Sequence, residues 1–389
     1  MTSLSDFIQR ISIYALLISV LGLVALGVVM LFSTSAYAQE AHGDMYYFIK
    51  KDAFWLIIGL AICLFGALTD YHLWQKSWKI WFAVSFVLLL LCFVPHVGMK
   101  INGSHRWVKL LVMPFQPSEI AKVAVVFFVA WWFSRAETRP RTLLQGFLIP
   151  LGVLFLLILP IAAEVDLGTS ALIGLTAIAL CFAGGANGWL IGGSIVTGLG
   201  GLLGIAMLIP ERAARMTTFM HPEADKLGKG LQQWQALIAF GSGGLEGLGL
   251  GNGRQKLLYL PYAHTDFIFP MIGEELGLFF TWLVVFGFIV IILCGGLIAS
   301  NAKDRFGKLL ATGIVLLISL QAAVNIGMTT SLLPNKGMPL PFISYGGSNL
   351  AVCLFMVGIL VNIHRIGAPI APVPERHQVV LAGRSVPRI

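Results

Sequence analysis

Residues 267–300 read FIFPMIGEELGLFFTWLVVFGFIVIILCGGLIAS, an apolar run whose only charged residues are Glu274 and Glu275. About 20 helical residues cross a hydrocarbon core of roughly 30 Å, so this run is long enough to span a membrane. Similar runs recur along all 389 residues, which are 57% hydrophobic and 11% charged, with a mean hydropathy of +0.86. The sequence therefore predicts an all-α, polytopic membrane protein without a separate soluble domain.

Polar breaks divide the chain into ten predicted helices. Their ranges are 12–35, 53–69, 80–97, 117–133, 143–163, 168–186, 188–210, 267–300, 307–330 and 349–364. They form one membrane domain over residues 12–364, between an N-terminal segment of residues 1–11 and a flexible tail of residues 365–389. One break is long, residues 211–266, and within it residues 231–240 place apolar side chains on one helical face, a pattern typical of a helix in the membrane interface.

Lysine and arginine set the predicted orientation. Ten spans put both termini on one side, and the breaks on that side hold Arg10, Lys76, Lys79, Arg135, Arg139, Arg141, Lys303, Arg305, Lys308 and Arg365. Cytoplasmic loops carry an excess of Lys and Arg, so that side is predicted to be cytoplasmic and residues 211–266 to face outward. The net charge of +8 is spread singly over the breaks, which favours membrane lipids over nucleic acid as partners.

Ionisable groups at membrane depth are costly and tend to face a cavity. Glu119 and Lys122 lie three residues apart at the start of the predicted helix 117–133. They either line a site or form an internal ion pair that locks two helices. Asp166, in the tight outward turn before the helix 168–186, either belongs to the same site or caps that helix.

Asp266 is the strongest candidate for chemistry, because it lies beside His264 at the outer mouth of the run 267–300. Desolvation would raise the pKa of this carboxyl, and Lys122 or Arg254 would lower it. Asp266 is therefore predicted to act as a base near neutral pH, the alternative being a helix cap. At least one of Glu274 and Glu275, about two turns deeper, should face the bundle interior.

Two irregular outward segments complete the candidate site. The glycine-rich residues 241–256 lack a P-loop or dinucleotide signature, but their backbone allows close approach to a ligand. Arg254 and Lys256 there would hold phosphate oxygens, unless the loop is merely flexible. Residues 333–349, which include Ser344, either line a cavity or simply connect two helices.

Four motifs, residues 116–122, 166–169, 264–277 and 339–348, resemble signatures of the SEDS family. The resemblance spans about residues 11–365, and GNGRQKLLYLP at 251–261 is more similar to division-type than to elongation-type members. It implies a peptidoglycan glycosyltransferase of the bacterial inner membrane that joins lipid II units on the outer face. It also implies Asp266 as catalytic carboxylate and a substrate-binding set of Glu119, Lys122, Asp166, Arg106, Arg254, Lys256, His264 and Ser344.

The resemblance further implies a class B penicillin-binding protein and other division proteins as partners. Small residues in the predicted helix 188–210 would permit close packing against a partner helix, namely Gly192, Gly193, Gly198, Gly200 and Gly201. Three positions depart from the family pattern. His105 stands where an arginine is frequent, Val165 where a proline is frequent, and Tyr262 where a glutamate is usual. A second acid near Asp266 is therefore in question, and Glu246 is the candidate replacement.

The predicted reaction is attack by an acceptor hydroxyl on the anomeric carbon of the donor, with inversion and loss of a lipid diphosphate. Asp266 would take the proton, and Lys122, Arg254 or a divalent cation such as Mg²⁺ or Mn²⁺ would stabilise the leaving group. No spacing of histidines and carboxylates predicts a dedicated metal site, so such a cation would be held partly by the substrate. The alternatives are a transporter (flippase) of a lipid-linked precursor and a non-catalytic scaffold.

Overall fold

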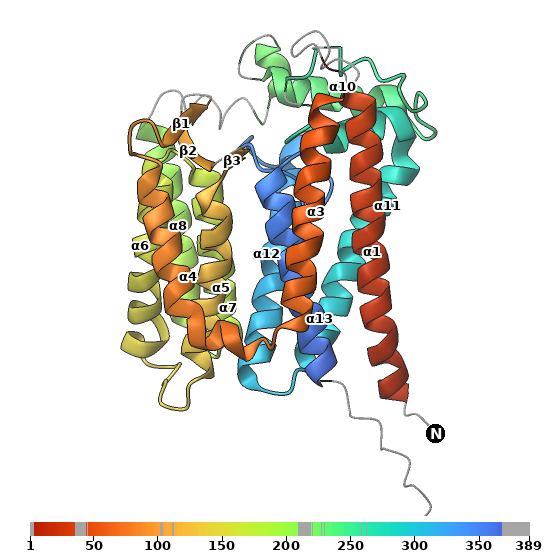
Figure 1. Ribbon diagram of the computed structural model, residues 1–389. Coiled ribbons are helices and arrows are strands. Elements are labelled where there is room, and N and C mark those ends of the chain that lie inside the picture. Colours follow the sequence, from red (N-terminus) through yellow and green to blue (C-terminus); the bar gives the residue numbers. More distant parts are fainter. Residues whose placement is uncertain are drawn as a thin grey trace, which may run out of the picture.

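The computed structural model describes residues 4–35, 44, 46–101, 104–110, 113–208, 219, 221–226, 228, 230–257, 259–261 and 263–367. Within these residues, ten long helices form the body of the protein (Figure 1). They are α1 (Leu4–Ser35), α3 (Tyr47–Leu68), α4 (His72–Leu91), α5 (Pro117–Ser134), α6 (Ile149–Ala163), α7 (Leu167–Ala183), α8 (Gly188–Leu208), α11 (Ile268–Ser300), α12 (Arg305–Thr329) and α13 (Gly347–Gly367). Seven described segments are long and apolar enough to cross a membrane, by length and composition. The predicted mostly helical, polytopic architecture is confirmed.

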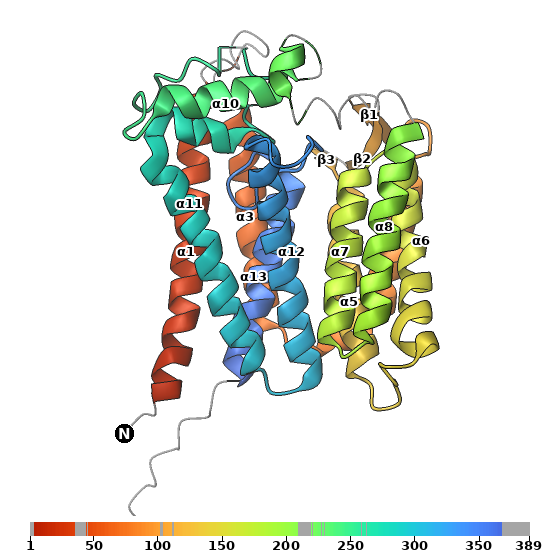
Figure 2. The same cartoon turned by 180° about the vertical axis from the view of Figure 1, so that it is seen from behind.

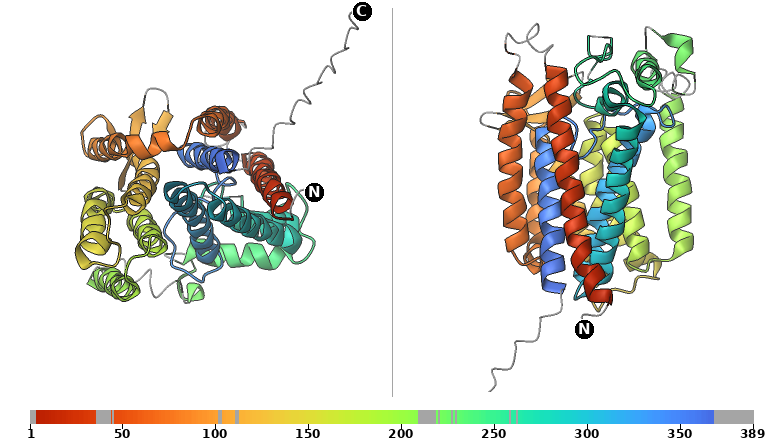
Figure 3. Two further views of the ribbon diagram at one scale, coloured as in Figure 1. Left: turned by 90° about the horizontal axis from the view of Figure 1, so that it is seen from below. Right: turned by 90° about the vertical axis from the view of Figure 1, so that its right-hand side faces the viewer.

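The helices form two groups that meet along α5 and α12. In Figures 1 and 2, α4 to α8 lie on one side and α1, α3, α11, α12 and α13 on the other. The view from below in Figure 3 shows the same division. Helix α12 packs against both α5 and α7, and α5 buries almost its entire length. Aromatic rings join the groups further, because Trp74 of α4 stacks on Phe127 of α5 and meets Phe355 of α13 edge-on.

Several helix ends differ from the prediction, including the start of α3, which lies at Tyr47 rather than at residue 53. Helix α1 already begins at Leu4, and α13 continues to Gly367. Helix α4 begins at His72 rather than residue 80 and ends at Leu91, because Lys76 and Lys79 do not interrupt it. A long lysine stem can cover apolar surface while its ammonium group reaches water, so a lysine does not have to end an apolar helix. Lys76 and Lys79 accordingly lie within α4. A π-helical turn, η1 (Leu144–Leu148), precedes α6.

A three-stranded antiparallel sheet at the outer end was not predicted. It comprises β1 (Gly98–Ile101), β2 (Ser104–Leu110) and β3 (Met113–Phe115) in that order. The residues between β1 and β2 are Asn102 and Gly103, the strongest short hairpin signal in a sequence. The prediction of an all-α protein is therefore corrected by the presence of this small sheet. The sheet matters because β2 carries Arg106 to the candidate site.

The long outward break contains a short 3-10 turn, η2 (Pro222–Asp225), and α10 (Leu231–Gly243), which lies across the outer ends of the long helices (Figure 2). Helix α10 buries Gln233, Ala236 and Ala239 and packs against α11. The predicted helix at 231–240 is confirmed, and its predicted interface face stays partly uncovered, since Trp234 and Leu237 are half-buried and Ile238 is exposed.

Helix α11 is broken near its outer end. Gly277 has φ of 77°, a conformation that glycine adopts without the steric cost of a side chain. The glycine-rich loop that follows α10 fills the break: the carbonyl of Gly244 accepts from Leu278 N (3.0 Å), and Gly249 N donates to the carbonyl of Glu275 (2.9 Å). The irregular backbone at the buried residue Gly277 is thus closed by hydrogen bonds from the loop.

Helix α1 begins and α13 ends at the same end of the bundle, opposite the sheet and α10 (Figure 1). The basic turns between α5 and α6 and between α11 and α12 also lie at this end. The end predicted to be cytoplasmic thus holds both of these helix ends and the basic turns, and the candidate site lies at the other end.

Candidate active site

Asp266 lies in the turn immediately before α11, and its backbone is held by α12. The Asn325 side-chain amide donates to the carbonyl of Asp266 (2.9 Å) and to the carbonyl of Met338 (2.6 Å). Gly337 has φ of 62°, and a Cβ added there would lie 3.1 Å from Oδ2 of Asp266. The turn before α11 and the segment before α13 therefore meet at this carboxyl.

The Asp266 carboxyl is half-buried, and no described residue donates a hydrogen bond to it. Burial raises its pKa to about 6, Arg106 acts to lower that pKa, and Asp166 acts to raise it. Arg106 is thus a cation that influences Asp266, whereas sequence reasoning assigned this effect to Lys122 or Arg254. Arg106 was missed in that role because β2, which places it there, was not predicted.

Asp166 serves as both helix cap and ion-pair partner. Its Oδ1 accepts from Thr169 N (3.1 Å) and its Oδ2 from the Thr169 hydroxyl (2.9 Å), which fixes the start of α7. The same Oδ2 lies 3.9 Å from Nε of Arg106, and Nη2 of Arg106 donates to the carbonyl of Val165 (3.1 Å). The two readings of Asp166 are therefore compatible, and the turn 164–166 holds Arg106 near Asp266.

Glu119 and Lys122 form a buried ion pair with an N–O distance of 2.7 Å. Lys122 also donates to the Gln321 side-chain carbonyl (2.8 Å), and Glu119 accepts from Asn349 of α13 (3.0 Å). The pair thus joins α5, α12 and α13. These contacts match the alternative of an internal ion pair that locks helices together. Gln321 extends this network toward Asp266, because its amide nitrogen donates to the carbonyl of Pro339, next to Met338 (2.9 Å).

Gln321 and Asn325 were missed in the sequence. The signal was available, since two amide side chains four residues apart lie on one face of the apolar stretch 307–330. Buried amides of this kind are hydrogen-bonded, and here they bind irregular backbone next to the candidate catalytic carboxyl.

The two cations of the glycine-rich loop have different surroundings. Lys256 is buried, pairs with Glu275 (2.6 Å) and donates to the Ser33 hydroxyl of α1 (2.9 Å). Its ammonium is therefore committed inside the protein rather than open to a ligand. The Arg254 side chain is exposed, and its backbone N–H donates to Glu274 (2.9 Å). Both Glu274 and Glu275 face the interior, which confirms and exceeds the expectation for that pair.

His264 and Ser344 hold the backbone around Asp266 in place. The His264 ring stacks on Phe48 of α3 with centroids 4.3 Å apart, and its carbonyl accepts from Tyr345 N (3.0 Å). The Ser344 hydroxyl accepts from Leu340 N (2.8 Å) and closes the turn before α13. Glu246, the candidate replacement for a second acid, is exposed in the turn after α10, and Tyr262 lies outside the described residues.

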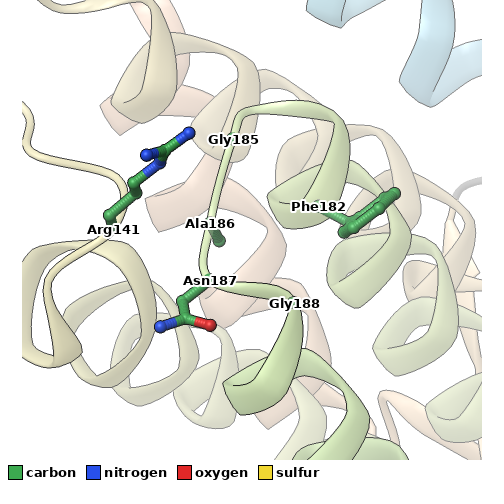
Figure 4. Close-up of a pocket in the computed structure, with 6 residues that line it drawn as sticks. All are labelled: Arg141, Phe182, Gly185, Ala186, Asn187 and Gly188. Carbon is green, nitrogen blue, oxygen red and sulfur yellow. The ribbon is translucent and has the colours of Figure 1, made fainter.

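A separate pocket lies at the end of the bundle opposite the sheet, between the turns that join α5 to α6 and α7 to α8 (Figure 4). It is lined by Arg141, Phe182, Gly185, Ala186, Asn187 and Gly188. This pocket is at the opposite end from Asp266 and contributes nothing to the candidate site. Among the described residues, no group of three or more histidines, cysteines and acids is arranged to hold a metal ion.

The fold and site define a polytopic membrane protein with a buried polar network at its outer end. The model of the cell cycle protein family FtsW/RodA/SpoVE matches residues 14–367. A probable peptidoglycan glycosyltransferase FtsW of Geobacter metallireducens is 38% identical over 92% of this chain and 95% of its own length. Stage V sporulation protein E of Bacillus subtilis is 38% identical over 90% of this chain and 96% of its own.

Two solved structures share the fold. One belongs to a peptidoglycan synthase complex, with a TM-score of 0.73 and 22% identity over 91% of this chain and 98% of the other. The other is the rod shape determining protein RodA of Thermus thermophilus, with a TM-score of 0.66 and 23% identity over 90% and 96%. The chain belongs to the FtsW/RodA/SpoVE family, also called the SEDS family, and is a multi-pass protein of the bacterial cytoplasmic membrane.

Proposed function

We propose that this chain polymerises lipid II into glycan strands on the outer face of the membrane, with Asp266 as the general base. Family membership and the relatives named as probable peptidoglycan glycosyltransferases support the activity. The names FtsW among these relatives support a role in septal synthesis. The observation that carries the role of Asp266 is a half-buried carboxyl at the outer end, with a pKa of about 6 and no described hydrogen-bond donor.

The proposed chemistry follows from these surroundings. A carboxylate with a pKa of about 6 is ionised at neutral pH yet remains more basic than an exposed aspartate. It would accept the proton of the attacking hydroxyl while the anomeric carbon forms the new C–O bond and the bond to the lipid diphosphate breaks. Asn325 holds the turn that carries Asp266, which limits the movement of the carboxylate that proton transfer requires.

Negative charge develops on the leaving diphosphate and needs cations. Arg106 is half-buried beside the turn 164–166, and Arg254 is exposed on the loop before Asp266. Lys122 and Lys256 are already paired with Glu119 and Glu275, so they contribute to the shape of the site and to its electrostatic field. We assign diphosphate binding to Arg106 and Arg254, with or without a divalent cation carried by the substrate.

The proposed partner is a class B penicillin-binding protein, together with other division proteins. One structure with the same fold belongs to a peptidoglycan synthase complex. In addition, five glycines of α8 meet no described atom within 4 Å of an added Cβ: Gly192, Gly193, Gly198, Gly200 and Gly201. An open small-residue surface of this kind permits close approach of another membrane helix.

The test compares Asp266→Asn with wild type for polymer formed from labelled lipid II, with and without the partner. Asparagine keeps the size of the side chain but removes its basic charge, so polymer should fall by about 10² to 10⁴-fold. The matched control is Glu223→Gln, which alters an exposed acid of the same outward break. Near-normal polymer from Asp266→Asn would remove Asp266 from this role. Movement of lipid II across vesicles without any polymer would favour the transporter instead.

A further inference from the structure

Glu164 is an acid beside Asp166 and Arg106 that the proposed mechanism does not use. It follows the last residue of α6 and is 2% exposed. Neither carboxyl oxygen has a hydrogen-bond partner by geometry among the described residues. The thiol of Cys92, at the end of α4, lies beside it, but a thiol is only a weak donor.

An ionised carboxylate in such surroundings is costly, because it exchanges water for groups that do not compensate its charge. Burial accordingly raises the pKa of Glu164 to about 8. Within this net value, Asp166 also acts to raise the pKa, whereas Cys92 and Arg106 act to lower it. Glu164 is therefore a neutral acid at neutral pH.

The charged and titratable groups that face Glu164 come from three elements: Cys92 ends α4, Arg106 lies on β2, and Asp166 precedes α7. Arg106 also influences Asp266. Its Nε is buried without a hydrogen bond, and it contacts the turn through Val165 and Asp166. Glu164 and Asp266 are thus both influenced by the guanidinium of Arg106, whose Nε lacks a hydrogen-bond partner.

We propose that Glu164 is a positioning residue that must be uncharged for glycosyl transfer, because only then does Arg106 remain available to Asp266 and the anionic substrate. As a carboxylate, Glu164 would draw the free Nε of Arg106 toward itself and add a second negative charge beside Asp166. This inference rests on the proposed role of Asp266.

The geometry of the turn supports this role. Val165 has φ of 66°, which directs its carbonyl to Nη2 of Arg106 at 3.1 Å. Glu164 and Asp166, on either side of Val165, both interact electrostatically with the same guanidinium. A change in the charge of Glu164 would act first on this cation and through it on Asp266.

The experiment measures kcat and KM for lipid II polymerisation from about pH 6 to 9.5 in wild type and Glu164→Gln. The amide has the shape and neutrality of the protonated acid, so the two profiles should agree near pH 6.5 and separate above pH 8. Wild type should lose about tenfold in kcat/KM per pH unit there, whereas Glu164→Gln should retain its rate. Both proteins are assayed with the same substrate, so titration of lipid II itself affects the two profiles equally. The control is Glu137→Gln, which alters an exposed acid at the opposite end of the bundle and should follow wild type.

Thermal stability provides a second readout. Because folding raises the pKa of Glu164, the folded state binds the extra proton between the unfolded and folded pKa values, and wild type should lose stability as pH rises from about 4.5 to 8. Glu164→Gln should lack this loss. Superimposable pH profiles of activity in the two proteins would overturn the proposal, as would failure of Glu164→Gln to fold. A fully active Asp266→Asn would instead overturn the proposed function, which keeps the two failures distinct.

Discussion

Gln321 and Asn325 lie one turn apart on α12 and hold adjacent carbonyls of the segment before α13, those of Pro339 and Met338. Gln321 also accepts from Lys122, and Asn325 also donates to the backbone of Asp266. One helical face therefore connects the buried ion pair to the candidate catalytic turn.

The first prediction concerns this face. Asn325→Leu should leave the carbonyls of Asp266 and Met338 without their donor, and each unsatisfied buried group costs about 1–3 kcal/mol. Thermal stability and polymer yield should both fall. Thr312→Ala, at the other end of α12 where its hydroxyl is exposed, should leave both unchanged. Equal behaviour of the two variants would show that Asn325 does not hold the site.

The second prediction concerns the acid side of the pH profile. Asp266 can accept a proton only when it is ionised, so kcat/KM should rise with pH through the pKa of about 6 and level off before the decline expected above pH 8 from ionisation of Glu164. Below that value, the rate should fall about tenfold per pH unit. A rate that stays constant between pH 5 and 7 would argue against Asp266 as the base.

The third prediction separates the two loop cations. Lys256→Met leaves Glu275 as an unpaired buried charge and should destabilise the protein by about 3–5 kcal/mol. The double variant Lys256→Met with Glu275→Gln should recover part of that loss. Arg254→Gln should leave thermal stability unchanged, because the Arg254 side chain is exposed. It should raise KM for lipid II, because we assign diphosphate binding to this residue. Similar stabilities for Lys256→Met and Arg254→Gln would contradict the assignment of an internal pair.

The fourth prediction concerns Val165. A β-branched residue at φ of 66° is strained, and such strain costs on the order of 1–3 kcal/mol. Val165→Gly should raise the melting temperature, whereas Val165→Pro should lower activity, because proline fixes φ near −65°. The control is Val196→Gly in the exposed part of α8, where glycine should destabilise the helix. A Val165→Gly variant less stable than wild type would exclude strain at this turn.

The fifth prediction concerns orientation in the membrane. In a variant without the five native cysteines, a cysteine at Lys303 should react only from the cytoplasm and one at Glu223 only from outside. Both positions are exposed, so reagent access depends on side rather than on burial. Labelling of Lys303→Cys by an impermeant reagent in intact cells would reverse the topology.

Hydropathy predicted the helices well because each must be apolar over a bilayer length, and Asp266 was identified because a carboxyl at an apolar boundary is unusual. Its local surroundings were less predictable. Lys122 and Arg106 are both basic residues at the outer end, and only the pairing of β2 with its neighbours brings Arg106 to the turn 164–166. Similarly, no local pattern indicates that Lys256 pairs with Glu275, because that contact depends on the break in α11.

That break also constrains how the chain enters the membrane. Helix α11 carries two carboxylates, and their partners lie on the preceding loop and, through Ser33, on the first helix of the chain. If α11 left the insertion machinery without these partners, it would expose both acids to lipid, which is unfavourable. We therefore expect α11 to stay in a protected, hydrated environment until α1 and the loop have closed around it. Because α1 and the loop are both synthesised before α11, their contacts with its two acids can form as soon as α11 emerges.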